Sequence, residues 1–173
     1  DCILTSSKTI NDDDPSLNCR IRGLEKHSPT RIILDRNLNI SLKSKVIKKS
    51  IECQTYIFYN KVKKNKIKLL KKKKIKLIYI ALNQYNYFNL FEVIFKIQKL
   101  GFSRILLEAG TSLSQSFLKN NLVSDLHIFV SQNVLGKNGS KAFRYNRDLN
   151  IFSKSNLNNV HLYGDKFYTC RLK

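Results

Sequence analysis

The sequence predicts an α/β protein with a mixed sheet that ends in antiparallel strands, and three observations support this fold class. Short apolar runs rich in β-branched residues, such as residues 31–34, are typical of buried strands. Residues 89–100 have the apolar period of a helix and separate two such runs, so they form a crossover long enough to join parallel strands. Alternating apolar and polar residues over 125–134 predict a later strand with one buried face.

The first part of the chain predicts strands separated by loops. Residues 2–4 are apolar and are followed by hydroxyl residues, as expected for the end of a strand. Residues 11–15 predict a turn, because Asn, Asp and Pro favour turns and a proline disfavours helix at the residue before it. A second loop is expected over 23–29. The runs 31–34 and 55–59 are rich in β-branched and aromatic residues and predict strands.

The middle of the chain begins with ten lysines between residues 61 and 76, which predict an exposed hairpin or a short helix. Residues 75–82 are apolar nearly throughout, which is typical of a strand covered on both faces. The helix over 89–100 is expected to end at Gly101 in a left-handed conformation. Residues 104–107 predict the next buried strand.

The last part of the chain predicts a second helix over 111–120, because apolar residues lie one turn apart there. Two short strands are expected near 160–163 and 167–172. The sequence shows no internal repeat and no second domain, so we expect residues 1–173 to form a single domain.

The formal net charge is +20, and half of it lies in the lysine-rich stretch 61–76. Such a charge indicates a polyanion partner such as nucleic acid. The abundance of Lys, Ile and Asn instead indicates a biased composition with a solvated surface, which is the interpretation we favour. The chain begins at Asp1 and contains no methionine, so we expect it to be a segment of a longer protein.

The cysteines and histidines predict no metal site. No two cysteines form a CxxC pair, and no histidine lies at metal-ligand spacing from them, so reduced thiols are expected. The sequence has no membrane-spanning apolar run and no secretion signal. These observations predict a cytoplasmic protein without a membrane partner.

A first candidate site lies where a predicted strand ends at Glu108, Ala109 and Gly110 and a helix begins with Thr111 and Ser112. Gly110 allows a ligand to approach the backbone, and a helix start offers free N–H groups and a positive dipole end to a phosphate. Ligands usually bind at such strand ends in α/β sheets. A capped helix start with a satisfied glutamate is the alternative, and the stretch is neither a GxGxxG fingerprint nor a GxxxxGK[ST] loop.

A second candidate site follows the first predicted strand, where carboxylates at 11–15 precede Leu17 and Arg20. Arg20 has the geometry to bind a phosphate with two parallel hydrogen bonds. Asp13 or Asp14 either binds ribose hydroxyls or caps a turn, and the residues alone leave both roles open.

Several blocks of the sequence occur together in one order, namely residues 5–20, 29–35, 107–113, 122–126 and 135–136. Together they closely resemble the reductase half of the bifunctional riboflavin biosynthesis deaminase–reductase, from Asp1 to about Gly139. The resemblance implies a dihydrofolate-reductase-like fold, a mixed sheet flanked by helices. It also implies an NADPH-dependent oxidoreductase that transfers hydride to the ribosylamino carbon of 5-amino-6-(5-phosphoribosylamino)uracil and yields the ribitylamino product.

The resemblance also implies roles for individual residues. Positions that match Thr9 and Asp13 contact the cofactor in the family. Positions that match Leu17, Arg20 and Glu108 contact the substrate. The family's loop and helix start that hold the cofactor phosphates correspond here to Gly110, Thr111, Ser112, Leu113, Ser114, Gln115 and Ser116.

Two further expectations concern charge. Arg36 stands where the family often has serine near the cofactor, and an arginine there would pair with the 2′-phosphate of NADPH. Glu108 or Asp13 is expected to be the catalytic carboxylate that stabilises a cationic imine or handles a proton.

The chain also departs from the family. The family's reductase begins with an additional strand that carries a lysine, followed by a helix, and neither lies in this chain. The zinc deaminase half is also absent, and we expect it upstream in the same longer chain. The family tends to dimerise through this domain, which implies a homodimer. The alternatives are a basic nucleic-acid-binding module, a related pterin or pyrimidine reductase of the same fold, and a non-catalytic domain.

Overall fold

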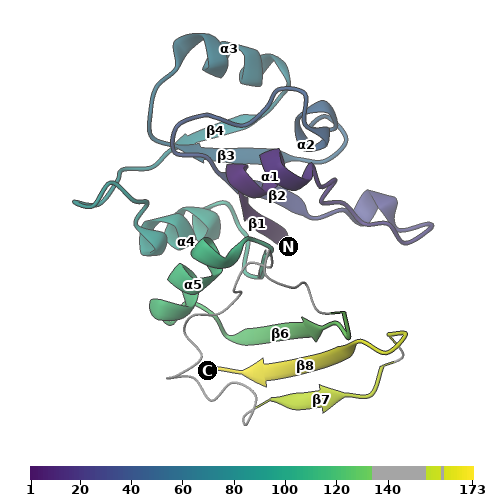
Figure 1. Cartoon of the computed structure of the whole chain (residues 1–173). Coiled ribbons are helices and arrows are strands. Elements are labelled where there is room, and N and C mark those ends of the chain that lie inside the picture. The colour runs from purple at the N-terminus through teal and green to yellow at the C-terminus, as the bar shows by residue number, and fades with distance from the viewer. Residues whose placement is uncertain (134–154, 161) are drawn as a thin grey trace. The chain divides into compact units, whose positions relative to one another are not determined.

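The computed structural model describes residues 1–133, 155–160 and 162–173, which form two compact units (Figure 1). The first unit is Asp1–Gly110 and the second is Thr111–Lys173. A single domain over residues 1–173 stays a prediction, because compact units of this size also occur within one domain.

The first unit is built on a parallel sheet of five strands in the order β4-β3-β2-β1-β5, and all residues of this unit are described. The strands are β1 (Cys2–Ser6), β2 (Thr30–Leu34), β3 (Thr55–Tyr59), β4 (Lys76–Tyr79) and β5 (Ile105–Leu107). Leu4 of β1 pairs with Ile32 of β2 on one side and with Leu107 of β5 on the other. Because the strands are parallel, the segments that follow β1 and β5 start at the same edge of the sheet.

The helices of the first unit are α1 (Ser7–Asp13), η1 (Glu25–His27, a 3-10 helix), α2 (Lys45–Lys48), α3 (Lys64–Lys72) and α4 (Leu90–Lys99). Ile10 of α1, Val46 of α2 and Leu70 of α3 belong to one buried cluster with strand residues, so these helices share a core on one side of the sheet (Figure 1). Helix α4 joins β4 to β5 and buries Val93 and Ile97. This α4 crossover and the left-handed Gly101 after it, with φ +91°, confirm the prediction for 89–101.

Helix α1 covers most of the segment predicted as a turn at 11–15, so that prediction is wrong for its first three residues. The Ser6 side chain caps the helix by accepting a hydrogen bond from the Thr9 N–H at 3.2 Å, and Ile10 is fully buried. The cap and this burial outweigh the local turn preference of the aspartates. The helix ends at Asp14, which has a left-handed φ of +43° and donates its N–H to the Ile10 carbonyl.

The outer strands of this sheet are less covered than the sequence predicts. Strand β4 lies at one edge, with Lys76 and Tyr79 exposed, and β5 lies at the other, with Leu106 58% exposed. The prediction of a strand covered on both faces at 75–82 is therefore wrong, and so is the prediction of a buried strand at 104–107, because composition does not reveal the order of strands in a sheet. The lysine-rich stretch forms α3, one of its two predicted forms.

The second unit consists of a helix and an antiparallel sheet in the order β6-β8-β7. Its elements are α5 (Thr111–Lys119), β6 (Asp125–Val130), β7 (Asn156–Asn158) and β8 (Lys166–Arg171). Phe129 of β6 stacks on Phe167 of β8, with ring centres 4.6 Å apart. The antiparallel end is thus confirmed. The prediction of a strand near 160–163 is wrong, because the observed strand in this part of the chain is β7. Val134 and the block 135–136 lie outside the described residues.

The described part of the chain contains no helix that combines the length and apolarity needed to cross a membrane. In the same residues, no group of three His, Cys, Asp or Glu side chains suits a metal ion. The cysteines are free thiols, and burial raises the pKa of Cys2 and of Cys53.

Candidate functional site

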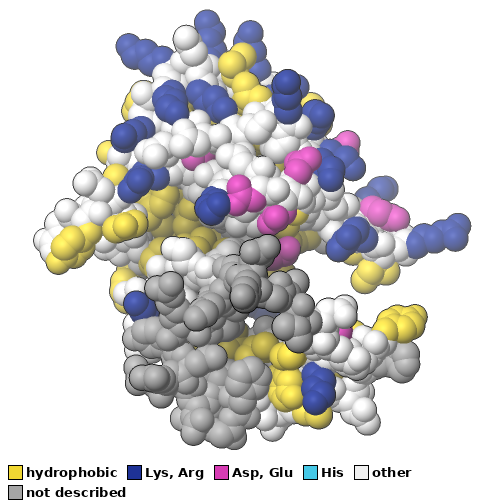
Figure 2. All heavy atoms as spheres, in the orientation of Figure 1, with side chains coloured by type: hydrophobic (Ala, Val, Ile, Leu, Met, Phe, Trp, Pro, Cys, Tyr) yellow, Lys and Arg dark blue, Asp and Glu magenta, His cyan; other side chains and the backbone are white. Residues whose placement is uncertain are grey.

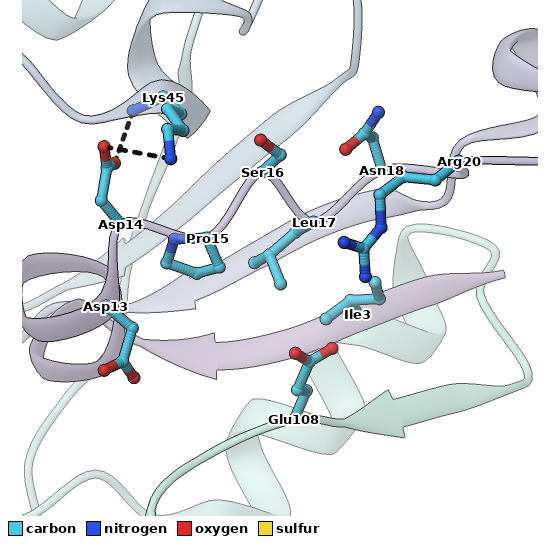
Figure 3. Close-up of a pocket in the computed structure, with 10 residues that line it drawn as sticks. All are labelled: Ile3, Asp13, Asp14, Pro15, Ser16, Leu17, Asn18, Arg20, Lys45 and Glu108. Atoms are coloured by element: carbon cyan, nitrogen blue, oxygen red, sulfur yellow. Dashed lines mark hydrogen bonds and ion pairs between the residues drawn. The ribbon is translucent and has the colours of Figure 1, made fainter. Parts of the chain in front are cut away.

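A cavity of about 310 Å³ opens in the first unit beside the carboxyl ends of β1 and β5 (Figure 3). Its lining residues are Ile3, Asp13, Asp14, Pro15, Ser16, Leu17, Asn18, Arg20, Lys45 and Glu108. They come from β1, the end of α1, the loop after α1, the start of α2 and the residue after β5. The parallel pairing of β1 with β5 brings these segments together.

The loop after α1, residues 14–20, forms one wall of the cavity. It begins with left-handed Asp14, which ends the helix, and Leu17 is also left-handed, with φ +46°. The Leu17 side chain is only 7% exposed because it packs into the cluster beneath α1. These two turns keep Leu17 against the core while Ser16, Asn18 and Arg20 line the cavity (Figure 3).

Arg20 and Glu108 are far apart in the sequence but line the same cavity. Glu108 continues the sheet beyond β5, since its N–H donates to the Leu4 carbonyl at 3.0 Å. Figure 3 shows the Arg20 guanidinium and the Glu108 carboxylate directed toward the same space. Both side chains are exposed, and no ion pair joins them within the described residues. The cavity therefore offers a cation and an anion to a polar ligand.

The structure brings together four of the predicted site residues, namely Asp13, Leu17, Arg20 and Glu108. The resemblance implies substrate contacts for Leu17, Arg20 and Glu108 and a cofactor contact for Asp13. The cavity shows only that these side chains lie close together, so the role of each residue stays a prediction.

Lys45 is a lining residue that the sequence analysis missed. Its backbone N–H donates to Asp14 Oδ1 at 2.8 Å, and its ammonium lies 3.9 Å from Asp14 Oδ2 (Figure 3). The contact ties the start of α2 to the end of α1 and places a second cation at the cavity. No local signal distinguishes this lysine, because it lies among several others in the sequence.

Two residues predicted to contact a cofactor do not line this cavity. Thr9 lies within α1, where its hydroxyl is 3.0 Å from the Ser6 hydroxyl. Arg36 follows β2, donates to the Asn86 carbonyl and lies with its guanidinium carbon 6.0 Å from the centre of the Tyr87 ring. Arg36 thus contacts the segment after β4 and does not line the cavity that contains Arg20.

The predicted phosphate loop begins at Gly110, the last residue of the first unit. Apart from Gly110 and its two chain neighbours, no atom of the described residues lies within 4 Å of the point where a Cβ on Gly110 would stand, so among these residues nothing blocks the approach of a ligand to this backbone. In the second unit, α5 begins at Thr111 and has no acidic residue in its first turn, which suits a phosphate. The Ser116 hydroxyl bonds the Ser112 carbonyl at 2.9 Å. The open backbone at Gly110 and the start of α5 each suit a phosphate group, such as those that a nicotinamide dinucleotide carries.

The charge of the first unit is concentrated on α3 and its flanks. Figure 2 shows many Lys and Arg side chains over that helix, whereas the acidic side chains lie lower on the same unit. No lysine of the stretch 61–76 forms an ion pair within the described residues. No residue of the stretch 61–76 lines the cavity that contains Asp13 and Glu108.

A family model described as the RibD C-terminal domain matches residues 1–167. Among curated relatives, the riboflavin biosynthesis protein RibD of Buchnera aphidicola subsp. Baizongia pistaciae is 31% identical over 163 residues, covering 83% of this chain and 40% of that protein. RibD of Aquifex aeolicus is 29% identical over 135 residues, covering 78% of this chain and 36% of that protein. The chain thus spans about two fifths of the length of these relatives.

A shorter relative, the 5-amino-6-(5-phosphoribosylamino)uracil reductase of Buchnera aphidicola subsp. Acyrthosiphon pisum, is 26% identical over 152 residues, covering 78% of this chain and 67% of that protein. Solved structures confirm the fold. Acinetobacter baumannii RibD matches 98% of this chain and 46% of its own, with a TM-score of 0.70 and 20% identity. A pyrimidine reductase-like protein of Corynebacterium diphtheriae matches 99% of this chain and 75% of its own, with a TM-score of 0.74 and 13% identity. The chain therefore belongs to the RibD C-terminal domain family, an oxidoreductase family of riboflavin biosynthesis.

Proposed function

We propose that this chain is the reductase part of an enzyme that reduces 5-amino-6-(5-phosphoribosylamino)uracil with NADPH to the ribitylamino product. Membership of the RibD C-terminal domain family supports this activity and favours it over a nucleic-acid-binding module. The observation that carries the proposal is the cavity that both Arg20 and Glu108 line. A cation and a carboxylate in one cavity suit a substrate that has a phosphate and a reacting nitrogen.

Arg20 is the residue that binds the substrate phosphate in this proposal. Its guanidinium is exposed at the cavity and has no carboxylate partner within the described residues, so its N–H groups are available for a bidentate contact. Leu17 supplies an apolar contact on the same wall. Fixing the phosphate places the sugar carbon that is to be reduced, which lowers the entropic cost of reaching the reactive geometry.

Glu108 and Asp13 are the candidates for charge and proton handling. When bound, NADPH supplies a hydride. The opened sugar ring carries a protonated imine, whose carbon takes the hydride while the nitrogen keeps the proton, so the product is a secondary amine. A carboxylate beside the imine stabilises its positive charge, or supplies in advance the proton that the nitrogen keeps. Both Glu108 and Asp13 line the cavity, which supports either residue in this role.

For the cofactor, we propose contacts from Thr9, Asp13 and Arg36 and from the stretch Gly110–Ser116. The open space beside Gly110 and the helix start at Thr111 support a phosphate contact. Arg36 would bind the 2′-phosphate that distinguishes NADPH from NADH, and this would require it to exchange its contact with the Asn86 carbonyl.

The test uses the longer parent protein that contains this chain, and it follows NADPH oxidation with the phosphoribosylaminouracil as substrate. We expect Arg20→Ala to raise KM about ten- to a hundredfold, since one charge-assisted contact is lost. We expect Glu108→Gln to lower kcat. Arg104→Lys is the matched control, because Arg104 is exposed immediately before β5 and does not line the cavity.

Two results would reject the proposal. The first is a parent protein that neither binds nor oxidises NADPH, and the second is an unchanged KM and kcat in both variants. A higher kcat/KM with a pterin than with the ribosylaminouracil would instead reassign the substrate within the same fold.

The partners of the whole protein are also part of the proposal. The relatives named RibD are longer than this chain, and a Thermotoga maritima structure with the same fold is named as a deaminase and reductase, which supports a deaminase domain upstream. A homodimer and a cytoplasmic location stay predictions, which gel filtration and cell fractionation of the parent protein would test.

A further inference from the structure

Arg31 is a buried cation beneath the cavity that the proposed reaction does not use. It lies on β2 opposite Ile3 of β1, a cavity residue, and it is only 1% exposed. No carboxylate forms an ion pair with it in the described part of the chain. Burial lowers the pKa of its guanidinium, yet an arginine keeps its proton in proteins, so a full charge is buried here.

Backbone carbonyls satisfy this charge instead of a carboxylate. Arg31 Nε donates to the Leu17 carbonyl at 3.1 Å, and Nη1 donates to the Val46 carbonyl at 3.3 Å and to the Lys49 carbonyl at 3.5 Å. The first contact reaches the cavity loop, and the other two reach the last turn of α2. One side chain thus joins the two segments that carry Arg20 and Lys45.

Leu17 is the residue through which this contact acts. Its left-handed φ of +46° is unfavourable for an L-residue, so surrounding contacts must hold it. Its side chain is buried in the core and its carbonyl is bound by Arg31, which restrains the residue from both sides. Arg20 follows three positions later and lines the cavity from the same loop (Figure 3).

We infer that Arg31 is a positioning residue, whose guanidinium fixes the loop 14–20 and thereby holds Arg20 in place to bind a phosphorylated sugar. Lysine and methionine do not reproduce this role. A lysine ammonium lacks the planar fork that reaches carbonyls on two segments, and a methionine leaves those carbonyls without a donor. The assignment of a phosphorylated sugar to Arg20 rests on the proposed function, whereas the restraint on the loop does not.

The first measurement is hydrogen exchange of the Cys19 amide, because this loop N–H donates to Ser28 Oγ at 3.1 Å and reports on loop order without any ligand. In the parent protein we expect Arg31→Lys to speed exchange at Cys19 at least about tenfold, as loss of a contact of roughly 1.4 kcal/mol implies. The amides of β3 should keep their wild-type rates. Equal speeding at both places would indicate general destabilisation and would overturn the inference, as would an unchanged rate at Cys19.

The second measurement is the dissociation constant for ribose 5-phosphate in a double-mutant cycle with Arg20→Ala. We expect Arg31→Lys to weaken binding about tenfold when Arg20 is present and less than about twofold when it is absent. Equal effects in both backgrounds would show that Arg31 does not act through Arg20, and Arg104→Lys should change neither constant. If the wild-type protein binds ribose 5-phosphate but does not oxidise NADPH, the proposed function fails while this inference stands. If Cys19 exchange changes as expected but the wild type does not bind ribose 5-phosphate, the loop restraint stands and the assigned ligand is wrong.

Discussion

The backbone of the cavity loop can be tested through protein stability at Leu17. This residue combines a left-handed φ of +46° with a side chain that is 7% exposed in the apolar cluster beneath α1. Removing a buried leucine side chain leaves a cavity, so Leu17→Ala should lower the free energy of unfolding by about 2–5 kcal/mol.

Leu17→Gly distinguishes the backbone conformation from the loss of packing. At an ordinary position glycine is less stable than alanine by roughly 0.5–1 kcal/mol, because its unfolded chain is more flexible. In the left-handed region a Cβ costs roughly 1–2 kcal/mol, and glycine avoids this cost. The two effects oppose each other, so we expect the glycine variant to be as stable as the alanine variant or about 1 kcal/mol more stable.

Equilibrium unfolding in urea, followed by far-ultraviolet circular dichroism, measures both variants. Leu4 provides the matched control, because it is fully buried on extended strand β1, where Leu4→Gly should be less stable than Leu4→Ala. If glycine were also clearly less stable than alanine at position 17, Leu17 would not be left-handed in solution. The loop geometry that presents Arg20 would then be wrong.

Two further predictions concern thiols and charge. Burial raises the pKa of the Cys2 and Cys53 thiols above their ordinary value of 9.0, so these thiols ionise first in the unfolded chain. The free energy of unfolding should therefore fall as the pH rises above 9.0 and should be independent of these thiols below it, which denaturant titrations at several pH values would show. A fall that persists in the Cys2→Ala, Cys53→Ala double variant would refute this cause. The lysines at 71–74 form no ion pair within the described residues, so they should speed the encounter with anionic NADPH at low salt. Changing all four to glutamine should lower the association rate constant at low salt but not at high salt, as stopped-flow mixing would measure. An unchanged rate at low salt would show that this surface does not steer the cofactor.

The local elements could be predicted from the sequence wherever one periodic signal dominated. Strand β3 has the predicted bounds 55–59, and α4 ends at a left-handed Gly101 as expected. Helix α1 was missed because its stability comes from the Ser6 cap and from the burial of Ile10, and burial depends on a core that is formed by distant residues. The candidate residues Arg20 and Glu108 were identified because charged and hydroxyl residues follow strand ends in a pattern that resembles one family.

By itself, then, the sequence determined the α/β class, the family and the residues with phosphate-binding or acid–base chemistry, since these depend on local composition and spacing. Only the tertiary structure decided which of them meet. The parallel pairing of β1 with β5 brings Glu108 to the loop that carries Arg20, while the contact between Asp14 and Lys45 adds a cation that no local pattern marks. The contacts of the buried Arg31 guanidinium also depend on the tertiary structure, because its carbonyl partners lie on segments that come together only when the chain folds.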